Sequence, residues 1–148
     1  MNIEIYTDGS TMNNGKKDSY GVYGYVILVD GHPVYEDAQF VSDTTNNRME
    51  AQAIIDSCKW ILNSLPHKNV TIYSDSQYCV NCVMKWIDDW AKGGWKADKA
   101  NFDLWKEVVA LKQRMNIKMI WVKGHSTNEW NNYVDGLCTS VYDKLTSP

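Results

Sequence analysis

The lengths of the connections between strand-like runs constrain the fold of this chain most. Three runs with the composition and alternation of strands cover about residues 2–8, 20–29 and 34–42. Asp30-Gly31, between the last two, is a strong hairpin signal. The connections are too short to hold a crossover helix, so we expect the three strands to form an antiparallel meander.

From Thr44 the apolar residues take the spacing of a helix that ends before Pro66. Further helical patterns and two short strand-like runs follow: a strand over Val70–Ser74, a helical stripe over Cys79–Trp90, a helix over about Asn101–Met115, a strand over Ile117–Val122 and a last helix from near Asn128. Strands that are reached through helical connections lie parallel to their neighbours, and the helices then cover the faces of the sheet. The expected fold class is therefore α/β, with a mixed five-stranded sheet.

Two of the predicted strands lead directly into an aspartate. Asp8 follows the first strand within Asp-Gly-Ser, and Asp75 follows the Val70–Ser74 strand. Turn chemistry is the alternative for Asp8-Gly9-Ser10, since Asp accepts backbone hydrogen bonds and Gly tolerates positive φ. If the two strands are parallel neighbours, however, both carboxylates reach the same edge of the sheet, where α/β proteins bind ligands.

Two more carboxylates are expected near that edge. Glu50 lies in the first turn of the helix after Thr44, and Asp135 lies beside the apolar face of the last helix. A capping role, with Asn47 as the N-cap, is the alternative for Glu50. Like charges about 4 Å apart repel by ~4 kcal/mol at an effective dielectric constant of 20, so a cluster of four requires cations. Mg²⁺ held by such a cluster indicates metal-assisted hydrolysis of a phosphodiester.

The composition fits one globular domain over residues 1–148, with 44% hydrophobic and 22% charged residues. A net charge of −3 argues against indiscriminate binding of nucleic acid. A local basic segment over Lys85–Lys99 nevertheless contains Trp86, Trp90 and Trp95, three of the seven tryptophans. We expect Trp90 and Trp95 to pack within this segment.

The cysteines and the absence of a long apolar run predict a cytoplasmic protein. Four cysteines without a recognisable secretion signal are expected to be reduced and buried. Cys79-x-x-Cys82 has no second pair of ligands for zinc, and both residues fall on one helical face, so we expect them to pack rather than to react.

The motifs taken together resemble those of the type 1 ribonucleases H, small metal-dependent enzymes that cut the RNA strand of RNA–DNA hybrids. They occur in family order across nearly the whole chain: Tyr6-Thr7-Asp8-Gly9-Ser10, Thr44-Thr45-Asn46-Asn47-Arg48-Met49-Glu50, Ser74-Asp75-Ser76-Gln77-Tyr78, Trp121-Val122-Lys123-Gly124-His125 and Asn131 through Asp135. The resemblance implies a ribonuclease H-like fold with strand order 3-2-1-4-5 and helices on both faces of the sheet.

The resemblance also implies the roles of the acidic residues and of one histidine. The four metal ligands are expected to be Asp8, Glu50, Asp75 and Asp135. His125 is expected to assist proton transfer or product release. Two Mg²⁺ ions would act together with the substrate, Mn²⁺ would substitute for them, and the products would have 5′-phosphate and 3′-hydroxyl ends.

Residues that bind the hybrid follow from the same resemblance. Polar residues expected at the minor groove are Asn14, Asn46, Asn47 and Gln77, with Thr45 at a DNA phosphate. Residues expected in a basic protrusion beside the DNA backbone are Trp86, Lys92 and Lys96, diluted by Asp88 and Asp89. Amides both donate and accept hydrogen bonds and so match a 2′-hydroxyl, although a cap or turn role is the alternative for each Asn. The expected partner is the RNA–DNA hybrid. The protein is expected to act as a monomer, with no association with a membrane and no obligate protein partner.

Three other functions fit the sequence less well. Aspartyl-phosphate phosphatases need a second Asp two residues before the glycine-flanked one, where this chain has Tyr6. A non-catalytic hybrid-binding protein has no use for four carboxylates and His125. A strand-transfer enzyme of the integrase type would lack the Asn and Gln groove residues and the protrusion.

Overall fold

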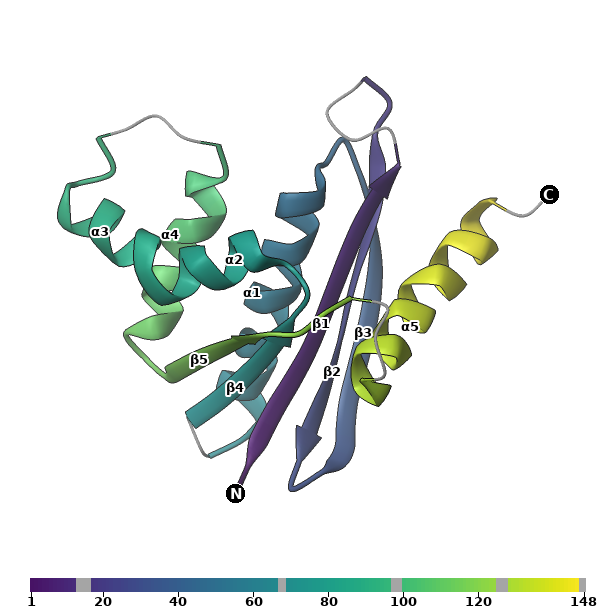
Figure 1. Cartoon of the computed structure of the whole chain (residues 1–148), viewed down its shortest axis with the longest axis horizontal. Helices are drawn as coiled ribbons and strands as arrows, with labels where there is room; N and C mark the ends of the chain where they lie inside the picture. The colour runs from purple at the N-terminus through teal and green to yellow at the C-terminus, as the bar shows by residue number, and fades with distance from the viewer. Residues whose placement is uncertain (13–16, 67–68, 97–99, 125–127, 147–148) are drawn as a thin grey trace.

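The computed structural model describes residues 1–12, 17–66, 69–96, 100–124 and 128–146. Its five strands are β1 (Ile3–Met12), β2 (Tyr20–Val29), β3 (His32–Ser42), β4 (Asn69–Ser74) and β5 (Asn116–Trp121). They form one mixed sheet of order β3-β2-β1-β4-β5 (Figure 1). The pairs β1–β2 and β2–β3 are antiparallel, and β1–β4 and β4–β5 are parallel. The predicted fold class and strand order are confirmed.

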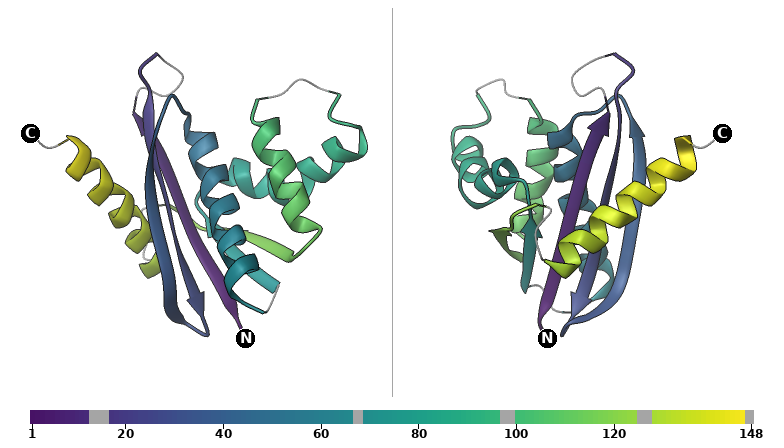
Figure 2. Two further views of the ribbon diagram at one scale, coloured as in Figure 1. Left: turned by 180° about the vertical axis from the view of Figure 1, so that it is seen from behind. Right: turned by 45° about the vertical axis from the view of Figure 1, so that its right-hand side comes forward.

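Helices cover both faces of this sheet. They are α1 (Asn46–Ser64), α2 (Gln77–Asn81), the π-helical turn η1 (Cys82–Trp86), α3 (Ile87–Lys92), α4 (Phe102–Lys112) and α5 (Glu129–Thr146). Figure 2 shows α5 crossing one face over β1–β3, with α1 and α4 on the opposite face. Within the described ranges, no helix combines the length and apolarity needed to cross a bilayer.

Alternation along β1 divides the hydrophobic core into two parts. Ile3 and Ile5 face the main core, which α1 and α4 complete with fully buried side chains such as Trp105. Tyr6, one residue further along the pleat, faces the opposite side and packs with Val134 of α5. Helices therefore pack against both faces of the sheet, and β1 is held between α1 and α5.

The four cysteines belong to this core. Cys58, Cys79, Cys82 and Cys138 are all buried, and none of them forms a disulfide. Cys79 and Cys82 pack in the main core from α2 and η1, so the expected packing of the Cys-x-x-Cys pair is confirmed.

The sheet differs from the prediction at the first motif. β1 does not end at residue 8 but continues to Met12, paired with β2 from Asp8↔Gly24 to Met12↔Tyr20. Only the parallel pairing with β4 stops early, at Tyr6↔Tyr73. Asp-Gly-Ser is therefore strand rather than turn, because β2 supplies hydrogen-bond partners that the local sequence does not reveal.

Two helix boundaries also differ from the prediction. The N-cap of α1 is Thr45 rather than Asn47, since the Arg48 N–H donates to Thr45 Oγ1 at 3.3 Å. The capping-box alternative for Glu50 is wrong, because that residue lies five positions after the cap instead of three. The helix expected over residues 101–115 ends earlier, at Lys112.

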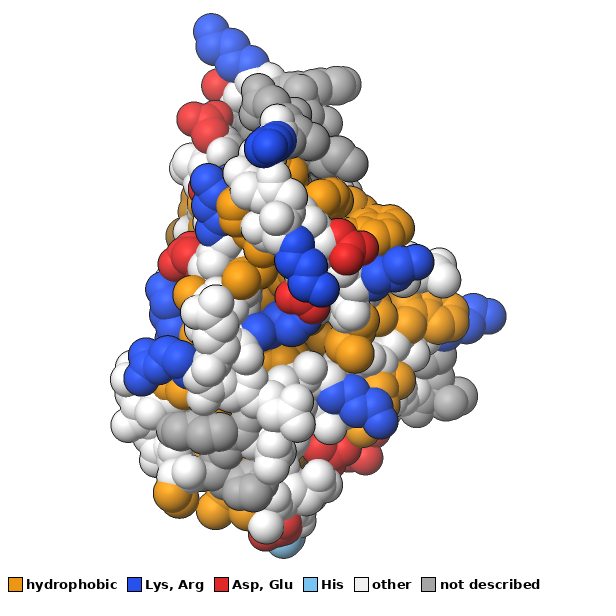
Figure 3. All heavy atoms as spheres, turned by 90° about the vertical axis from the view of Figure 1, so that its left-hand side faces the viewer, with side chains coloured by type: hydrophobic (Ala, Val, Ile, Leu, Met, Phe, Trp, Pro, Cys, Tyr) orange, Lys and Arg blue, Asp and Glu red, His pale blue; other side chains and the backbone are white. Residues whose placement is uncertain are grey.

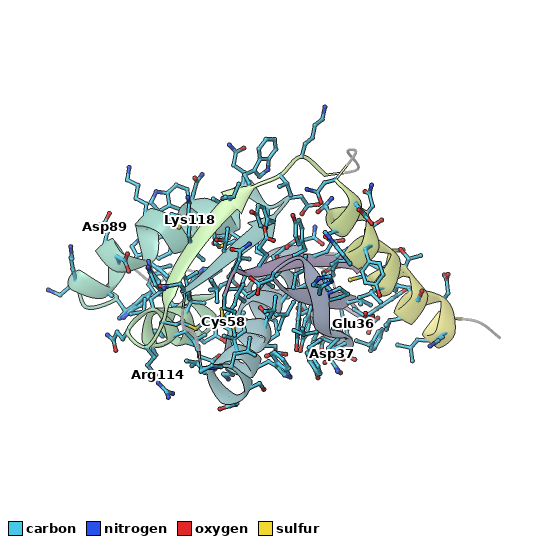
Figure 4. The ribbon with its side chains drawn as sticks, turned by 90° about the horizontal axis from the view of Figure 1, so that it is seen from below. Glu36, Asp37, Cys58, Asp89, Arg114 and Lys118 are labelled. Atoms are coloured by element: carbon cyan, nitrogen blue, oxygen red, sulfur yellow. The ribbon has the colours of Figure 1, made fainter. Side chains whose placement is uncertain are left out.

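The two edges of the sheet are protected from pairing with another chain in different ways. On β5, the Met119 N–H donates to Met84 Sδ at 3.2 Å, so η1 covers part of that edge. The β3 edge has Glu36 and Asp37 near its middle, and Figure 4 shows them far from Asp89 of α3. Charged residues on an open edge disfavour pairing with another chain.

Candidate active site

Three carboxylates from separate elements meet beyond the end of the β1–β4 pairing. Asp8 and Asp75 each lie two residues past the last parallel pair, Tyr6↔Tyr73, so the register places them side by side. Glu50 reaches them from the first turns of α1. One ligand oxygen from each of the three carboxylates lies within 4.8 Å of the other two. This distance suits a shared cation and is unfavourable for three free negative charges.

Glu50 is brought to the cluster by a close approach of α1 to β1 at Gly9. A Cβ built on Gly9 would lie 2.8 Å from the backbone nitrogen of Glu50 and from Met49 Cβ. The described backbone does not give Gly9 a positive φ, so the glycine is needed for space rather than for its conformational freedom. The same Gly9 N–H donates to Asp8 Oδ1 at 2.9 Å.

The cluster is buried and electrostatically strained. Burial raises the pKa of Asp8 to about 8, and the carboxylates of Asp75 and Asp135 add to the increase. Burial also raises the pKa of Glu50 well above its ordinary value, with further contributions from Asp8 and Asp75. The Gly9 N–H opposes both increases. The site therefore favours protons, or cations in their place.

One oxygen atom of the cluster is available as a ligand for a cation. Glu50 is only 6% exposed, and within the described chain its Oε2 has no hydrogen-bond partner. A buried carboxylate oxygen without a partner is costly and is rare in native proteins. Because hard divalent cations prefer carboxylate oxygens, Asp8, Glu50 and Asp75 fit Mg²⁺ or Mn²⁺ well.

Asp135 approaches from α5 but lies outside the tight group of three. Its charge and a side-chain hydrogen bond both contribute to the raised pKa of Asp8. α5 lies close to the sheet because Gly24, the partner of Asp8 on β2, leaves room for Cys138: a Cβ on Gly24 would be 3.0 Å from its Sγ. Asp135 is half-buried and borders the cluster on its α5 side.

Two residues of the fourth motif, Trp121 and Gly124, hold Asp75 in place, and neither was predicted to have a role in the site. Trp121 Nε1 donates to the Asp75 carbonyl oxygen at 3.1 Å. A Cβ on Gly124 would be 2.9 Å from Asp75 Oδ2, so the backbone before His125 lies directly against this carboxylate. The one feature of the sequence that pointed to these two residues was their place in the Trp-Val-Lys-Gly-His motif.

Four of the predicted substrate-binding residues lie at the starts of α1 and α2, close in sequence to Glu50 and Asp75. Asn46, Asn47 and Gln77 are exposed at the starts of α1 and α2, and Thr45 is the half-buried N-cap described above. Asn46 and Asn47 precede Glu50 by about one turn, and Gln77 follows Asp75 by two residues. Asn14 and His125 lie outside the described residues.

The residues of the predicted basic protrusion lie in η1, in α3 and in the segment that follows α3. Trp86 is 37% exposed, and Lys92 and Lys96 are exposed. Trp86 lines an open, mostly apolar depression of about 300 Å³ together with Tyr78, Trp90 and Ala100. Figure 3 views this side of the molecule and shows Lys and Arg side chains interspersed with hydrophobic and acidic ones.

The expected packing of the other two tryptophans of this segment is confirmed. The rings of Trp90 and Trp95 contact Phe102 of α4, with centroid distances of 5.2 and 4.9 Å. Both also pack against the main core. These two side chains therefore fix the protrusion to α4, and Trp86 is the one of the three that is exposed.

Comparisons with known proteins agree with this arrangement. The family model described as RNase H matches residues 1–142. The chain is 37% identical over 148 residues to a ribonuclease H of Clostridium botulinum, covering 97% of both proteins. Among solved structures it is similar to LC9-RNase H1, a type 1 RNase H with the type 2 active-site motif, with a TM-score of 0.80, 28% identity and coverage of 97% of this chain and 73% of that one. It shares its fold with LC11-RNase H1, with a TM-score of 0.74, 22% identity and coverage of 98% and 99%. The chain thus belongs to the RNase H family, and it is a type 1 member, as its motifs predict.

Proposed function

We propose that this chain is an endoribonuclease that hydrolyses the RNA strand of RNA–DNA hybrids and leaves 5′-phosphate and 3′-hydroxyl ends. The observation that supports this most is the group of the buried Asp8 and Glu50 with the half-buried Asp75, in which Glu50 Oε2 has no partner within the described chain, in a member of this family. LC11-RNase H1, which has the same fold, has been solved in complex with an RNA/DNA hybrid. We further propose that residues 1–148 form one catalytic domain that acts as a cytoplasmic monomer.

The carboxylates would hold two Mg²⁺ ions when substrate is bound, with Mn²⁺ as a substitute. Bound metal supplies an activated water and stabilises the negative charge on the leaving oxygen. The protein's part is to present deprotonated oxygens at fixed positions. Asp8 is fixed by the Gly9 N–H, and Asp75 by Trp121 and Gly124. Asp135 completes the set from α5.

His125 would serve the reaction without holding metal. Gly124, its neighbour in sequence, packs against Asp75, so the chain reaches the cluster immediately before this histidine. An imidazole can take up or release a proton near neutral pH. We assign it to proton transfer or product release.

Recognition of the RNA strand is assigned to the amides beside the cluster. Asn46, Asn47 and Gln77, with Asn14, would contact the minor groove, where an amide can pair with a 2′-hydroxyl as donor or acceptor. Thr45 would contact a DNA phosphate near the start of α1, where the helix dipole favours an anion. Trp86, Lys92 and Lys96 would lie along the DNA backbone.

The proposal is tested with three end-labelled duplexes of one sequence: an RNA–DNA hybrid, an RNA duplex and a DNA duplex. We expect cleavage of the RNA in the hybrid alone, and products with 5′-phosphates. Tight binding of the hybrid without cleavage in Mg²⁺ or Mn²⁺ would favour the non-catalytic alternative. Cleavage of the DNA duplex would show that the amide set does not select RNA.

A further inference from the structure

A single lysine of α4 holds the segment of the protrusion that contains Trp86. Lys112 Nζ donates to the Val83 carbonyl oxygen at 2.6 Å and to Asp88 Oδ2 at 2.8 Å. Val83 precedes Trp86 by three residues, and Asp88 follows it by two. Lys112 therefore fastens the chain on both sides of Trp86, and we refer to Lys112, Val83 and Asp88 as the lysine clamp.

The lysine clamp lies at an irregular, π-helical turn of the helix. The Ile87 N–H donates to the Cys82 carbonyl, five residues back, whereas in an α-helix it would donate to Val83. This π-helical turn takes from the Val83 carbonyl its usual helical donor, and Lys112 supplies one in its place. Val83 is fully buried, and buried carbonyl groups are normally hydrogen-bonded, so the bond from Lys112 stabilises this turn.

The clamp is partly shielded from solvent. The Lys112 side chain is 19% exposed, against 53% for Lys59 in the Lys59–Glu107 pair between α1 and α4. An amine with two acceptors and little solvent is held more firmly than one in an open surface pair. On the other side of η1, Met84 is fixed to β5 through its contact with the Met119 N–H.

We propose that Lys112 is a positioning residue that sets the placement of Trp86 against the hybrid and thereby the KM for the hybrid. It acts through η1 and is not assigned to contact the substrate or the active-site carboxylates Asp8, Glu50, Asp75 and Asp135. The inference rests on the proposed function, because Trp86 is assigned there to the DNA backbone. The inference goes beyond that function because Lys112 lies outside the proposed binding surface and yet controls the position of Trp86 within it.

The first test compares Lys112→Met with Lys59→Met. Both changes remove one positive charge and one ion pair to an acid, but only Lys112 holds η1. From the initial rates of hybrid cleavage, Lys112→Met should raise KM by about 3- to 10-fold, with kcat within about 2-fold of wild type. Lys59→Met should leave both constants unchanged. An unchanged KM in Lys112→Met, or a loss confined to thermal stability, overturns the proposal.

The second test uses Asp88→Ala, for which two explanations predict opposite signs. If charge alone matters, removing an acid from the protrusion strengthens binding of the polyanionic hybrid and lowers KM. If the clamp matters, losing one of its anchors raises KM, by about 2- to 3-fold. Asp88 is half-exposed, so this variant should fold even if Lys112→Met does not. A lower or unchanged KM contradicts the clamp.

A double-mutant cycle tests whether Lys112 acts through Trp86. In a Trp86→Ala background, Lys112→Met should have no further effect on KM, because the ring that it positions is gone. Independent, multiplying effects would refute a role through Trp86. Failure of the proposed function itself looks different, since the wild type would then not cut the hybrid at all.

Discussion

Gly9 and Glu50 approach so closely that a Cβ on Gly9 would lie 2.8 Å from the Glu50 backbone nitrogen. This contact joins the strand that holds Asp8 to the helix that holds Glu50. The separation of the two backbone segments that hold these carboxylates is therefore fixed by close packing. Any side chain at position 9 must push the start of α1 away from β1.

Gly9→Ala is accordingly expected to damage the site as well as the fold. Overpacking against backbone should lower the free energy of unfolding by about 1–3 kcal/mol, and Mg²⁺ should stabilise the variant less than the wild type. Gly136→Ala is the control, since a Cβ there meets nothing within 4 Å and Ala suits a helix better by up to ~1 kcal/mol. Thermal unfolding with and without Mg²⁺ measures both effects. Equal Mg²⁺ stabilisation of Gly9→Ala and wild type would show that this contact does not set the site.

The raised pKa of Asp8 predicts how stability depends on pH without metal. Above pH 3.8 the unfolded chain releases this proton while the folded protein keeps it up to about pH 8. The destabilising contribution of Asp8 therefore grows across this window and levels off above it. In chelator, the melting temperature of Asp8→Asn should exceed that of the wild type by an amount that increases from pH 4 to pH 8.

Mg²⁺ should reverse this order. In the proposed site Mg²⁺ would bind the deprotonated carboxylates of the folded protein, so it should stabilise the wild type more than Asp8→Asn, and more strongly as the pH rises. If Asp8→Asn were instead less stable than wild type in chelator at pH 8, and Mg²⁺ changed neither, Asp8 would be an ordinary structural residue.

Trp86→Ala should separate binding from folding. Loss of this exposed ring is expected to weaken binding of the hybrid about 10-fold, equivalent to ~1.4 kcal/mol, with little change in the melting temperature. Trp105→Ala is the contrast, because a fully buried indole contributes about 3–5 kcal/mol to stability. Binding is measured by fluorescence anisotropy of a labelled hybrid in chelator. A collapse in the melting temperature of Trp86→Ala would favour a packing role.

Substitution of His125 and substitution of Asp75 should affect catalysis to different extents. His125→Ala is expected to retain measurable turnover, since His125 is assigned to proton transfer or product release and not to metal binding. Asp75→Asn should lose far more activity while it keeps its affinity for the hybrid. Single-turnover rates together with binding constants distinguish the two. Complete inactivation of both variants would contradict the roles assigned.

Much of this architecture was predictable because connection length and register act through simple geometry. Short links fixed the antiparallel meander, and helical links fixed the parallel pair β1–β4. With those strands in register, Asp8 and Asp75 had to be neighbours. Helical spacing likewise placed Cys79 and Cys82 in the core.

Other features depend on partners distant in sequence and could not be predicted. Asp8-Gly9-Ser10 has the local composition of a turn, yet β2 keeps it in the sheet. The π-helical turn before Trp86 is accompanied by a donor from Lys112, which lies 29 residues after Val83. A π-helical turn contains about one residue more than an α-helical turn, and the spacing of apolar residues in the sequence does not reveal this difference.

The central claim is a carboxylate site that cuts the RNA strand with the help of a divalent metal. One measurement tests it most directly: cleavage of hybrids labelled on either strand, by wild type and by Asp75→Asn, in millimolar Mg²⁺ and in excess chelator. We expect cuts in the RNA strand only, complete dependence of the wild type on Mg²⁺, and a loss of about 100-fold or more in Asp75→Asn. Cleavage that persists in chelator, or an Asp75→Asn variant as active as the wild type, would contradict the account.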